Sequence, residues 1–269
     1  MSEPDGRSMD RGARWSALLG LLAEHGRLSV AQVVESLGVS EATVRRDFGD
    51  LAAQQLVTRT HGGVVASSVA YDLPVRYKQG GGDSAKERIA SFAADLVPEG
   101  SVVGFNGGTT TSATARKLAA RADLAASSRR PSITVVTNAL NIATEMVLRP
   151  FIRCVSLGGV ARPESYELSG PLASMVLGEL WLDTVVLGVD GVSGAGGATC
   201  EHEGEAGINS LMVQRADRVV VVGTGDKVGR RAFARICSSE RIQVLVTDAT
   251  APADALAEIR AAGVSVEVV

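Results

Sequence analysis

Residues 29–48 read SVAQVVESLGVSEATVRRDF, and this stretch decides the fold of the first part of the chain. Its first four residues, Ser29 to Gln32, have the form of a capping box. In such a box the Ser hydroxyl accepts a helix N–H group and the Gln side chain bonds back to the backbone. Leu28 and Val33 stand at the positions of a hydrophobic staple around it. The pattern therefore predicts that a helix begins at Ser29.

A second helix is predicted to follow after a very short turn. Gly38 suits the left-handed conformation that ends a helix, and Ser40 is a favourable N-cap with Glu41 in the turn behind it. Two helices joined by so few residues are typical of a helix-turn-helix. Apolar residues at helical spacing predict one further helix upstream: Trp15, Leu18, Leu19 and Leu22.

The last of these helices has one apolar and one small, basic side. If Val44 marks zero on a wheel of about 100° per residue, Phe48 and Leu51 fall within about 40° of it. The opposite side is then formed by Ala42, Arg46 and Gly49, with Thr43 and Arg45 on its flanks. Small residues around an Arg allow close approach to a DNA major groove, where Arg reaches guanine edges or phosphate.

Two short β-rich runs after this helix predict a hairpin-like wing. They are Leu56 to Thr60 and Val64 to Ala66, and the turn between them is His61-Gly62-Gly63. Arg59 and His61 lie near its tip. A winged helix-turn-helix is therefore expected over residues 11–66.

The charge of this segment favours a different reading, a small helical packing domain with solvated arginines. Residues 1–66 hold seven basic and eight acidic side chains, a net charge of −1. The whole chain, with 27 basic and 30 acidic side chains, is also slightly acidic. A DNA-binding module usually carries a basic patch. The case for DNA therefore rests on the tight turn, the caps and the wing.

From about Ser84 onward, short runs of Val, Ile and Leu alternate with helical segments. Such runs suit strands that are buried on both faces of a parallel sheet, with the helices as crossovers. The runs are 101–105, 133–136, 152–157, 184–189, 218–222, 244–247 and 264–268. An α/β domain is therefore expected over residues 84–269. Pro74 and the triplet Gly80 to Gly82 predict a linker over 67–83, and residues 1–10 are expected to be a disordered tail.

Polar residues follow four of the predicted strands, at the carboxyl edge where parallel sheets bind ligands. A loop with two glycines and three threonines, followed by a helix through Ala122, offers bare N–H groups for a phosphate. Lys227 is one of four lysines beside 23 arginines. The candidate effector-binding residues on these grounds are Asn106, Gly107, Gly108, Thr109, Thr110, Thr111, Asn138, Asp190 and Lys227.

The first part of the chain resembles the DeoR family of bacterial transcriptional regulators. The resemblance lies in residues 39–48, VSEATVRRDF, in Leu51, and in residues 59–63, RTHGG. It implies that the paired arginines belong to a recognition helix. The residues expected to bind DNA are Ser40, Ala42, Thr43, Arg45, Arg46, Arg59 and His61.

The second part, from Arg76 to Asp248, resembles the sensor domain of the same family. The similar motifs include the Gly-Gly-Thr-Thr-Thr loop and those at Lys86, Val136–Ala143, Leu157–Gly159, Gly188–Gly191, Glu205-Ala206 and Lys227–Arg230. The resemblance implies a fold similar to sugar-phosphate isomerases and a phosphorylated sugar or related metabolite as effector, and it adds Glu205 to the expected site. Two positions depart from the family, Asn106 in place of Asp and Thr224-Gly225-Asp226 in place of Asp-Ser-Ser. The carboxylate of Asp226 would repel a phosphate unless Lys227 compensates.

Other chemistries fit the sequence less well. Residues 200–205, with one Cys, one His and three Glu, could hold a metal, but a polar loop is the simpler reading, and no metal or cofactor is expected. The glycines at 223, 225 and 229 imitate a dinucleotide loop, yet too few residues follow them for that fold. Asp190, Glu205 and Lys227 could serve as acid and base in an isomerase, but a fold alone does not supply catalysis.

The sequence also predicts where the protein works. Three cysteines without close spacing make a disulfide framework unexpected, which favours a reducing compartment. No apolar run reaches the roughly 18 residues of a membrane helix, and no signal peptide is discerned. We therefore expect a cytoplasmic, sequence-specific repressor, not an enzyme, that binds operator DNA as a homo-oligomer and responds to a small phosphorylated effector, without contact to membranes.

Overall fold

The computed structural model describes residues 10–25, 27–53, 57–60, 62–66 and 84–269. The chain divides into two compact units, Met1–Gly82 and Asp83–Val269. The expected linker over 67–83 and, apart from Asp10, the expected tail over 1–10 lie outside the described residues.

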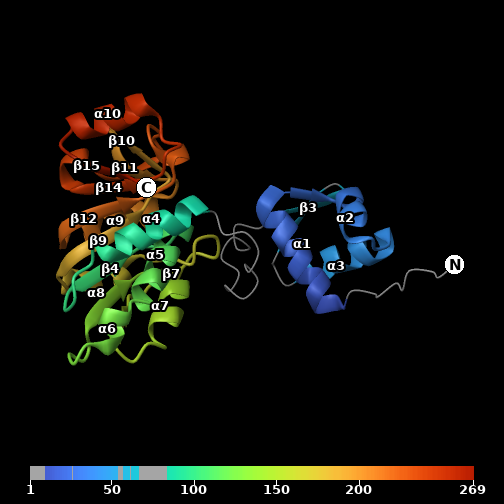
Figure 1. Ribbon diagram of the computed structural model, residues 1–269, viewed down its shortest axis with the longest axis horizontal. Coiled ribbons are helices and arrows are strands. Elements are labelled where there is room, and N and C mark those ends of the chain that lie inside the picture. Colours follow the sequence, from blue (N-terminus) through green and yellow to red (C-terminus); the bar gives the residue numbers. More distant parts are fainter. Residues whose placement is uncertain (1–9, 26, 54–56, 61, 67–83) are drawn as a thin grey trace. The chain divides into compact units, whose positions relative to one another are not determined.

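The first unit is built from three helices and a small antiparallel sheet (Figure 1). The helices are α1 (Arg11–His25), α2 (Val30–Leu37) and α3 (Glu41–Ala53), and the strands are β1 (Arg27–Ser29), β2 (Val57–Thr60) and β3 (Gly63–Ala66). The sheet order is β1-β3-β2, so the wing has a third strand that the sequence did not predict. Leu28, on that strand, is buried in the apolar core of this unit.

The predicted local signals are present in this unit. Ser29 Oγ accepts a hydrogen bond from Gln32 N, and Gln32 Oε1 accepts one from Ser29 N, so the capping box is complete. Gly38 ends α2 in the left-handed region, with φ of 65°, and donates to Val34 O. Val44, Phe48 and Leu51 are all buried, as expected for the inner side of α3. The helix-turn-helix prediction is confirmed.

The second unit has a parallel seven-stranded sheet in the order β15-β14-β12-β9-β4-β5-β6. All seven runs predicted from the sequence form it. The strands are β4 (Val102–Phe105), β5 (Ile133–Thr137), β6 (Ile152–Ser156), β9 (Leu182–Gly188), β12 (Ala216–Val222), β14 (Val244–Thr247) and β15 (Ser265–Val268). The expected α/β fold is therefore confirmed.

Helices cover both faces of this sheet. The side chain of Val186 packs in one core with residues of α4 (Ser84–Asp95), α5 (Thr109–Ala119), α6 (Ala122–Ala126) and α7 (Leu140–Met146). Its neighbours Val185 and Leu187 pack in the other core. That core holds residues of α8 (Pro171–Gly178), α9 (Glu203–Gln214) and α10 (Ala253–Ala261). The helix expected to continue through Ala122 ends at Ala119, and α6 follows it after a short break.

Smaller antiparallel elements surround the carboxyl edge and were not predicted. One sheet has the order β10-β11-β13, from Gly191–Ser193, Gly197–Cys200 and Ala234–Cys237. The other joins β7 (Val160–Ala161) to β8 (Leu168–Ser169). Two 3-10 turns complete the unit, η3 (Gly225–Lys227) and η4 (Ser239–Arg241). These short strands lack the unbroken runs of Val, Ile and Leu that mark the strands of the central sheet, so no β pattern distinguishes them in the sequence.

Candidate functional sites

The outer side of α3 has the composition expected for groove contact. Ala42, Arg45 and Arg46 are exposed, and Thr43 is half-buried. Ser40 caps the helix by accepting from Thr43 N at 3.2 Å, and the two hydroxyl oxygens lie 2.9 Å apart. The Ser40 and Thr43 hydroxyls therefore bond to each other at the start of α3.

The arginines of this surface differ in their surroundings. Arg45 forms an exposed ion pair with Glu41, one turn away, with 3.3 Å between the charged atoms. Arg46 points away from the core on the next position of the helix, and Arg59 is exposed on β2. His61 lies outside the described residues. An exposed pair such as Arg45–Glu41 contributes little stability, so it leaves Arg45 able to exchange Glu41 for phosphate.

Asp47 holds α1 against α3, a role that sequence reasoning missed. Its carboxylate is 2% exposed and accepts from Arg14 Nε at 2.5 Å and from Trp15 Nε1 at 2.9 Å. Burial alone would raise the pKa of Asp47, but the bonds from Arg14 and Trp15 outweigh it, so the pKa is lowered. Asp47 is the third residue after Val44 and therefore falls on the inner side of α3, and this position was the available sequence signal for its burial.

Asn106 joins the ends of two neighbouring strands in the second unit. Its Nδ2 donates to Gly188 O at 3.0 Å, and its Oδ1 accepts from Gly188 N at 2.7 Å. Only an amide can both donate and accept here, since a carboxylate has no donor. The Asn106 amide, at the position where the resemblance led us to expect Asp, therefore ties the end of β4 to the end of β9 at the carboxyl edge of the sheet.

The glycine-threonine loop after β4 opens α5 as expected. Gly108 has a φ of 127°, a conformation that disfavours side chains, and α5 begins at Thr109 without a side-chain cap. Thr110 and Thr111 are buried, and Thr111 Oγ1 donates to Gly108 O at 2.9 Å. An uncapped helix N-terminus directs its first N–H groups and the positive end of its dipole to an anion.

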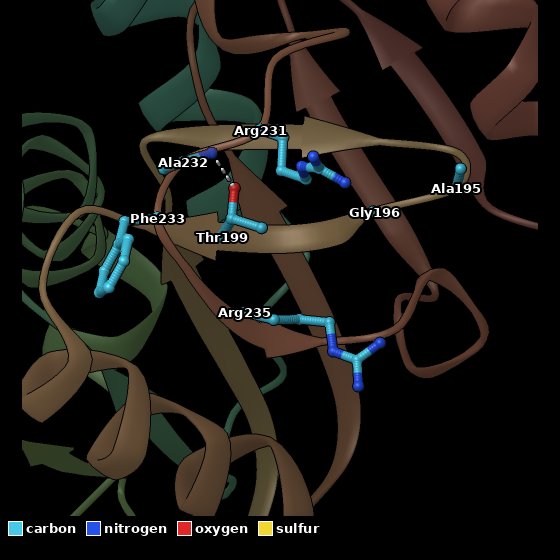
Figure 2. A pocket seen from close by; sticks show the side chains of 7 residues that line it. All are labelled: Ala195, Gly196, Thr199, Arg231, Ala232, Phe233 and Arg235. Carbon is cyan, nitrogen blue, oxygen red and sulfur yellow. Dashed lines mark hydrogen bonds between the residues drawn. The ribbon is translucent and has the colours of Figure 1, made fainter.

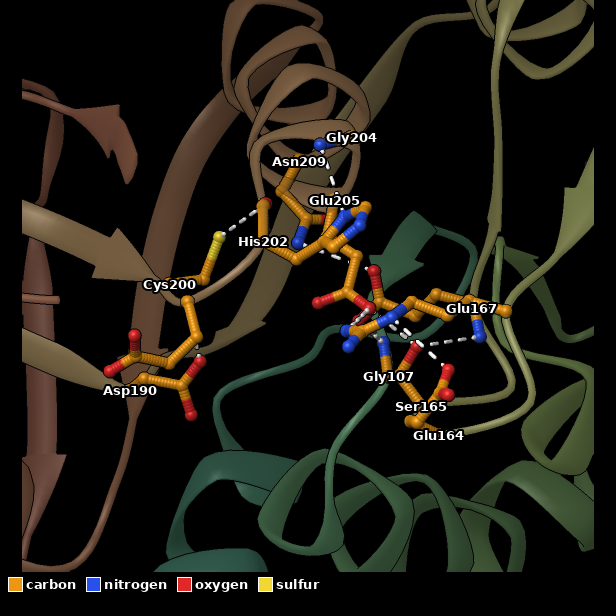
Figure 3. A network of polar contacts seen from close by, with 12 residues as sticks. Gly107, Glu164, Ser165, Glu167, Asp190, Cys200, His202, Gly204, Glu205 and Asn209 are labelled. Carbon is orange, nitrogen blue, oxygen red and sulfur yellow. Dashed lines mark hydrogen bonds and ion pairs between the residues drawn. The ribbon is translucent and has the colours of Figure 1, made fainter. Parts of the chain in front are cut away.

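Glu167 closes this loop from the side and was missed by sequence reasoning (Figure 3). Its Oε1 accepts from Gly107 N at 2.8 Å, while its Oε2 accepts from Asn138 Nδ2 at 3.0 Å and from Asn209 Nδ2 at 3.4 Å. Burial and the charge of Glu205 raise the pKa of Glu167 to about 7, against the effect of these three donors. A Cβ on Gly107 would lie 2.6 Å from Glu167 Cγ, so any larger residue here would displace the Glu167 side chain.

Glu205 belongs to the same polar network. Glu205 Oε1 accepts hydrogen bonds from Arg162 Nη1 at 2.8 Å and from Ser165 Oγ at 2.5 Å, and Glu205 is 8% exposed. Asn138, Glu167 and Glu205 thus meet from three elements, the β5–α7 loop, the β7–β8 loop and α9. Three of the expected residues, Gly107, Asn138 and Glu205, lie in this network.

Asp190 and Lys227 lie at neighbouring strand ends. Asp190 Oδ2 accepts from Glu201 N at 3.0 Å, and Lys227 Nζ lies 3.7 Å from Asp226 Oδ2. A Cβ at Gly223 would lie 3.7 Å from both Lys227 Cβ and Val189 Cγ2, so both side chains lie close to Gly223, just after β12. Within the described part of the chain, no hydrogen bond or ion pair joins Asp190 or Lys227 to residues 107–111.

The residues that could have held a metal have other roles. His202 Nδ1 accepts from Gly204 N and caps α9, and Cys200 Sγ donates to His202 O. Among the described residues, no group of three or more His, Cys, Asp or Glu side chains is arranged to hold a metal ion. In the same described part, no helix is long and apolar enough to cross a bilayer.

A pocket of about 550 Å³ lies beside β11 (Figure 2), and the predicted residue Asp190 adjoins its wall, since Asp190 N donates to Thr199 O at 3.0 Å. It is lined by Ala195, Gly196, Thr199, Arg231, Ala232, Phe233 and Arg235. Thr199 Oγ1 accepts from Ala232 N and donates to Gly191 O, so it holds the wall together rather than facing a ligand. Both arginines and Phe233 are exposed.

Comparison with known proteins covers both units. The model of the DeoR-like helix-turn-helix domain matches residues 14–69, and that of the DeoR C-terminal sensor domain matches residues 83–249. The HTH-type transcriptional regulator GlpR of Haloferax volcanii is 32% identical over 250 residues, 93% of this chain and 94% of that protein. The glycerol-3-phosphate regulon repressor of Escherichia coli is 28% identical over 244 residues, 91% of this chain and 93% of that protein.

A solved structure is similar at a greater distance. Ribose 5-phosphate isomerase A of Methanocaldococcus jannaschii has a TM-score of 0.36 and 18% identity, over 53% of this chain and 52% of that one. This likeness is too distant to support a shared activity.

Proposed function

This chain belongs to the DeoR family of transcriptional regulators, and on that basis we propose that it is a repressor whose operator binding is controlled by a phosphorylated sugar or related metabolite. The proposal assigns DNA recognition to the first unit and effector binding to the second. We further infer that the protein is a homo-oligomer, because one winged helix gives limited DNA specificity and two paired half-sites multiply that specificity. We also infer that it works in the cytoplasm.

DNA recognition is assigned to the outer side of α3. Ala42 is small and exposed, which allows the helix to enter a major groove, and Arg46 extends from the same side. Ser40, Thr43, Arg45, Arg59 and His61 are assigned to the flanks of this contact. Asp47 supports this contact indirectly, because its hydrogen bonds to α1 hold α3 in place.

Effector binding rests on one observation, the uncapped N-terminus of α5 at the carboxyl edge of the sheet. Gly108 and the threonines at 109 to 111 supply N–H groups and hydroxyls there, with no charged side chain in the loop itself. Lys227 lies at the end of β12, beside β9, and we assign to it the compensating positive charge. Anions bind at such helix ends because the N–H groups and the dipole favour negative charge.

The names of the relatives narrow the compounds to test first. One of them is named as the repressor of a glycerol-3-phosphate regulon. We therefore propose small phosphorylated polyols and sugars as the effector class of this chain.

The proposal is tested by DNA binding in the presence of candidate effectors. Operator fragments are obtained by in vitro selection from random duplex DNA with the purified full chain, and affinity is followed by fluorescence anisotropy. We expect a phosphorylated compound, with glycerol 3-phosphate as the first probe, to change the DNA affinity and its dephosphorylated partner, here glycerol, to have no effect. Equal effects of both compounds, or no response to any phosphorylated compound, would contradict the assignment.

A further inference from the structure

The phosphate-binding loop assigned above already holds an internal acidic group. Glu167 is 4% exposed, and its Oε1 occupies the N–H group of Gly107. Tyr166, just before it, has a φ of 59°, a left-handed conformation that is uncommon for a residue with a side chain. Its carbonyl accepts from Leu140 N at 3.0 Å, so this strained turn is fixed and aims Glu167 at the loop.

An anion on the next amides of the loop would lie close to this carboxylate. Successive Cα atoms are about 3.8 Å apart, so a ligand on Gly108 N–H is a near neighbour of a group on Gly107 N–H. Two negative groups within about 4 to 6 Å disfavour each other's charged form. Filling the loop with an anion therefore favours the loss of charge from either the ligand or Glu167.

The surroundings of Glu167 can accept both of its protonation states. Asn138 and Asn209, the two donors to Oε2, are 0% and 1% exposed, and the Oδ1 atom of each is buried without a hydrogen-bond partner. A half-turn of the Asn209 amide would present this oxygen to Oε2 in place of the NH2 group, whereas Asn138 is held in its present orientation by a second bond, from Nδ2 to Leu168 O at 3.3 Å. A protonated Glu167 could then donate where the carboxylate now accepts.

The charged groups around Glu167 do not hold it in one state. Glu205 approaches from α9 and disfavours a second negative charge, while Arg162, on the same β7–β8 loop, is paired with Glu205 and Glu164. The imidazole of His202, at the start of α9, is engaged in capping that helix, where its Nδ1 accepts from Gly204 N. Burial and Glu205 together raise the pKa of Glu167 to about 7.

We propose that Glu167 couples anion binding at the Gly108–Thr111 loop to the uptake of one proton, which moves from solvent to Glu167 Oε2. Glu167 acts in this as a positioning residue that does not itself contact the effector. The inference rests on the proposed phosphate site. It makes the regulator sensitive to pH through the same ligand, since binding tightens as pH falls, by at most about tenfold per pH unit for one proton.

The test uses inorganic sulfate as a probe, because sulfate keeps both charges across neutral pH whereas a phosphate monoester titrates near pH 6. Sulfate affinity of the full chain is measured by calorimetry at about pH 6 and about pH 8. We expect wild type to bind sulfate several-fold more tightly at the lower pH. In Glu167→Gln the side chain is neutral at both pH values, so this variant should bind sulfate with the same affinity at both. At about pH 8 it should bind sulfate more tightly than wild type does.

Two matched variants separate this effect from other charges nearby. Glu164→Gln removes a carboxylate from the same loop at an exposed position, and His202→Asn removes the neighbouring titratable ring while keeping an N-cap side chain. Both should keep the pH dependence of wild type. If His202→Asn abolishes it instead, the coupling does not belong to Glu167.

A second measurement does not depend on any variant folding. Calorimetry of wild type near pH 7 in two buffers of different ionisation enthalpy gives the number of protons taken up with sulfate, and we expect a positive value of up to one. Sulfate binding without proton uptake, or weaker binding by Glu167→Gln at both pH values, would overturn the coupling and leave the anion site intact. Absence of sulfate binding under all conditions would overturn the anion site itself.

Discussion

At the scale of single residues, neighbouring arginines on α3 have different surroundings. Arg45 has Glu41 as a partner on its own helix, whereas Arg46 lies at the centre of the outward side. We assign sequence reading to Arg46 and backbone contact to Arg45. An Arg at the centre of a recognition helix can bond two atoms of one guanine, and this carries specificity, while phosphate contacts set position.

Arg46→Ala is therefore expected to weaken operator binding by about 1 to 3 kcal/mol per half-site without unfolding the chain. Arg46→Lys keeps the charge but loses the two-pronged contact, so it should lower the discrimination between operator and random DNA more than it lowers affinity for random DNA. Anisotropy titrations on both DNAs, with circular dichroism to check folding, measure this. Operator affinity unchanged in folded Arg46→Ala would refute the assignment of α3.

Two residues of the proposed effector site should differ in their contributions to the free energy of effector binding. Thr110→Ala removes a neutral group and should weaken effector binding by about 0.5 to 1.5 kcal/mol, whereas Lys227→Ala removes a charged donor worth about 1.5 to 3 kcal/mol. Calorimetry with the compound found in the effector screen decides between them. Wild-type affinity in both variants would place the ligand elsewhere.

The same pair of variants has an internal control. Both positions lie in the second unit, so operator binding without effector should be unchanged in each. Weakening in Thr110→Ala alone would indicate that Asp226, 3.7 Å from Lys227, keeps that lysine engaged. The departure from the family at residues 224–226 would then alter the site, as the sequence led us to expect.

At the scale of elements, the bond network of Asp47 joins the first helix of the DNA-binding unit to the recognition helix. Arg14 and Trp15 both lie on α1, and Asp47 lies on α3. The carboxylate is almost fully buried, so removing its charge leaves polar donors facing an apolar core. Breaking such a buried pair costs about 3 to 5 kcal/mol.

Asp47→Asn should accordingly destabilise the first unit, and it should do so most above the unfolded pKa of Asp, about 4. Because the folded pKa of Asp47 is lowered, its stabilising contribution is present above the unfolded pKa and is lost as pH falls through the folded pKa. Wild type and variant should therefore converge in acid. Asp50→Asn, at an exposed ion pair with Arg11, is the control and should change stability by less than about 1 kcal/mol.

Urea unfolding followed by tryptophan fluorescence measures this, in a Trp181→Phe background. The chain has two tryptophans, so Trp15 alone then reports on the first unit. A difference between wild type and Asp47→Asn that stays constant down to strongly acidic pH would contradict the role of the Asp47 charge.

At the scale of the whole molecule, one chain joins a helix-turn-helix domain to a sensor domain. This arrangement suits a ligand that controls DNA binding. A ligand that favours one arrangement of a two-part protein shifts the population of the DNA-competent state. Glu205, which an isomerase could use as a base, is bonded to Arg162 and Ser165, and Asp190 bonds to Glu201 N. These contacts favour binding over proton transfer.

Purified protein incubated with common sugar phosphates is therefore expected to yield no isomerised or deaminated product. Proton NMR over many hours, with a known isomerase as positive control, provides the measurement. Turnover that disappears in Asp190→Asn would reverse this conclusion and support an enzyme.

The helix-turn-helix, the strands of the central sheet and the family could all be predicted from the sequence. The helix-turn-helix followed from a capping box, a glycine stop and a serine cap within twelve residues, and the seven parallel strands followed from runs of β-branched residues. These signals are short-range, because helix caps and hydrophobic periods are properties of adjacent residues. The same holds for the glycine-threonine loop that opens α5, since its strand, glycines and helix are consecutive in the chain.

Only the tertiary structure decided which distant residues meet. Glu167 bonds to Gly107, 60 positions earlier, and Asp47 bonds to Arg14, 33 positions earlier. Neither pairing leaves a local pattern, because it depends on strand order, on the β7–β8 hairpin and on the packing of α1 against α3. A buried carboxylate is tolerated only where donors converge on it, and that convergence is a property of the folded chain alone.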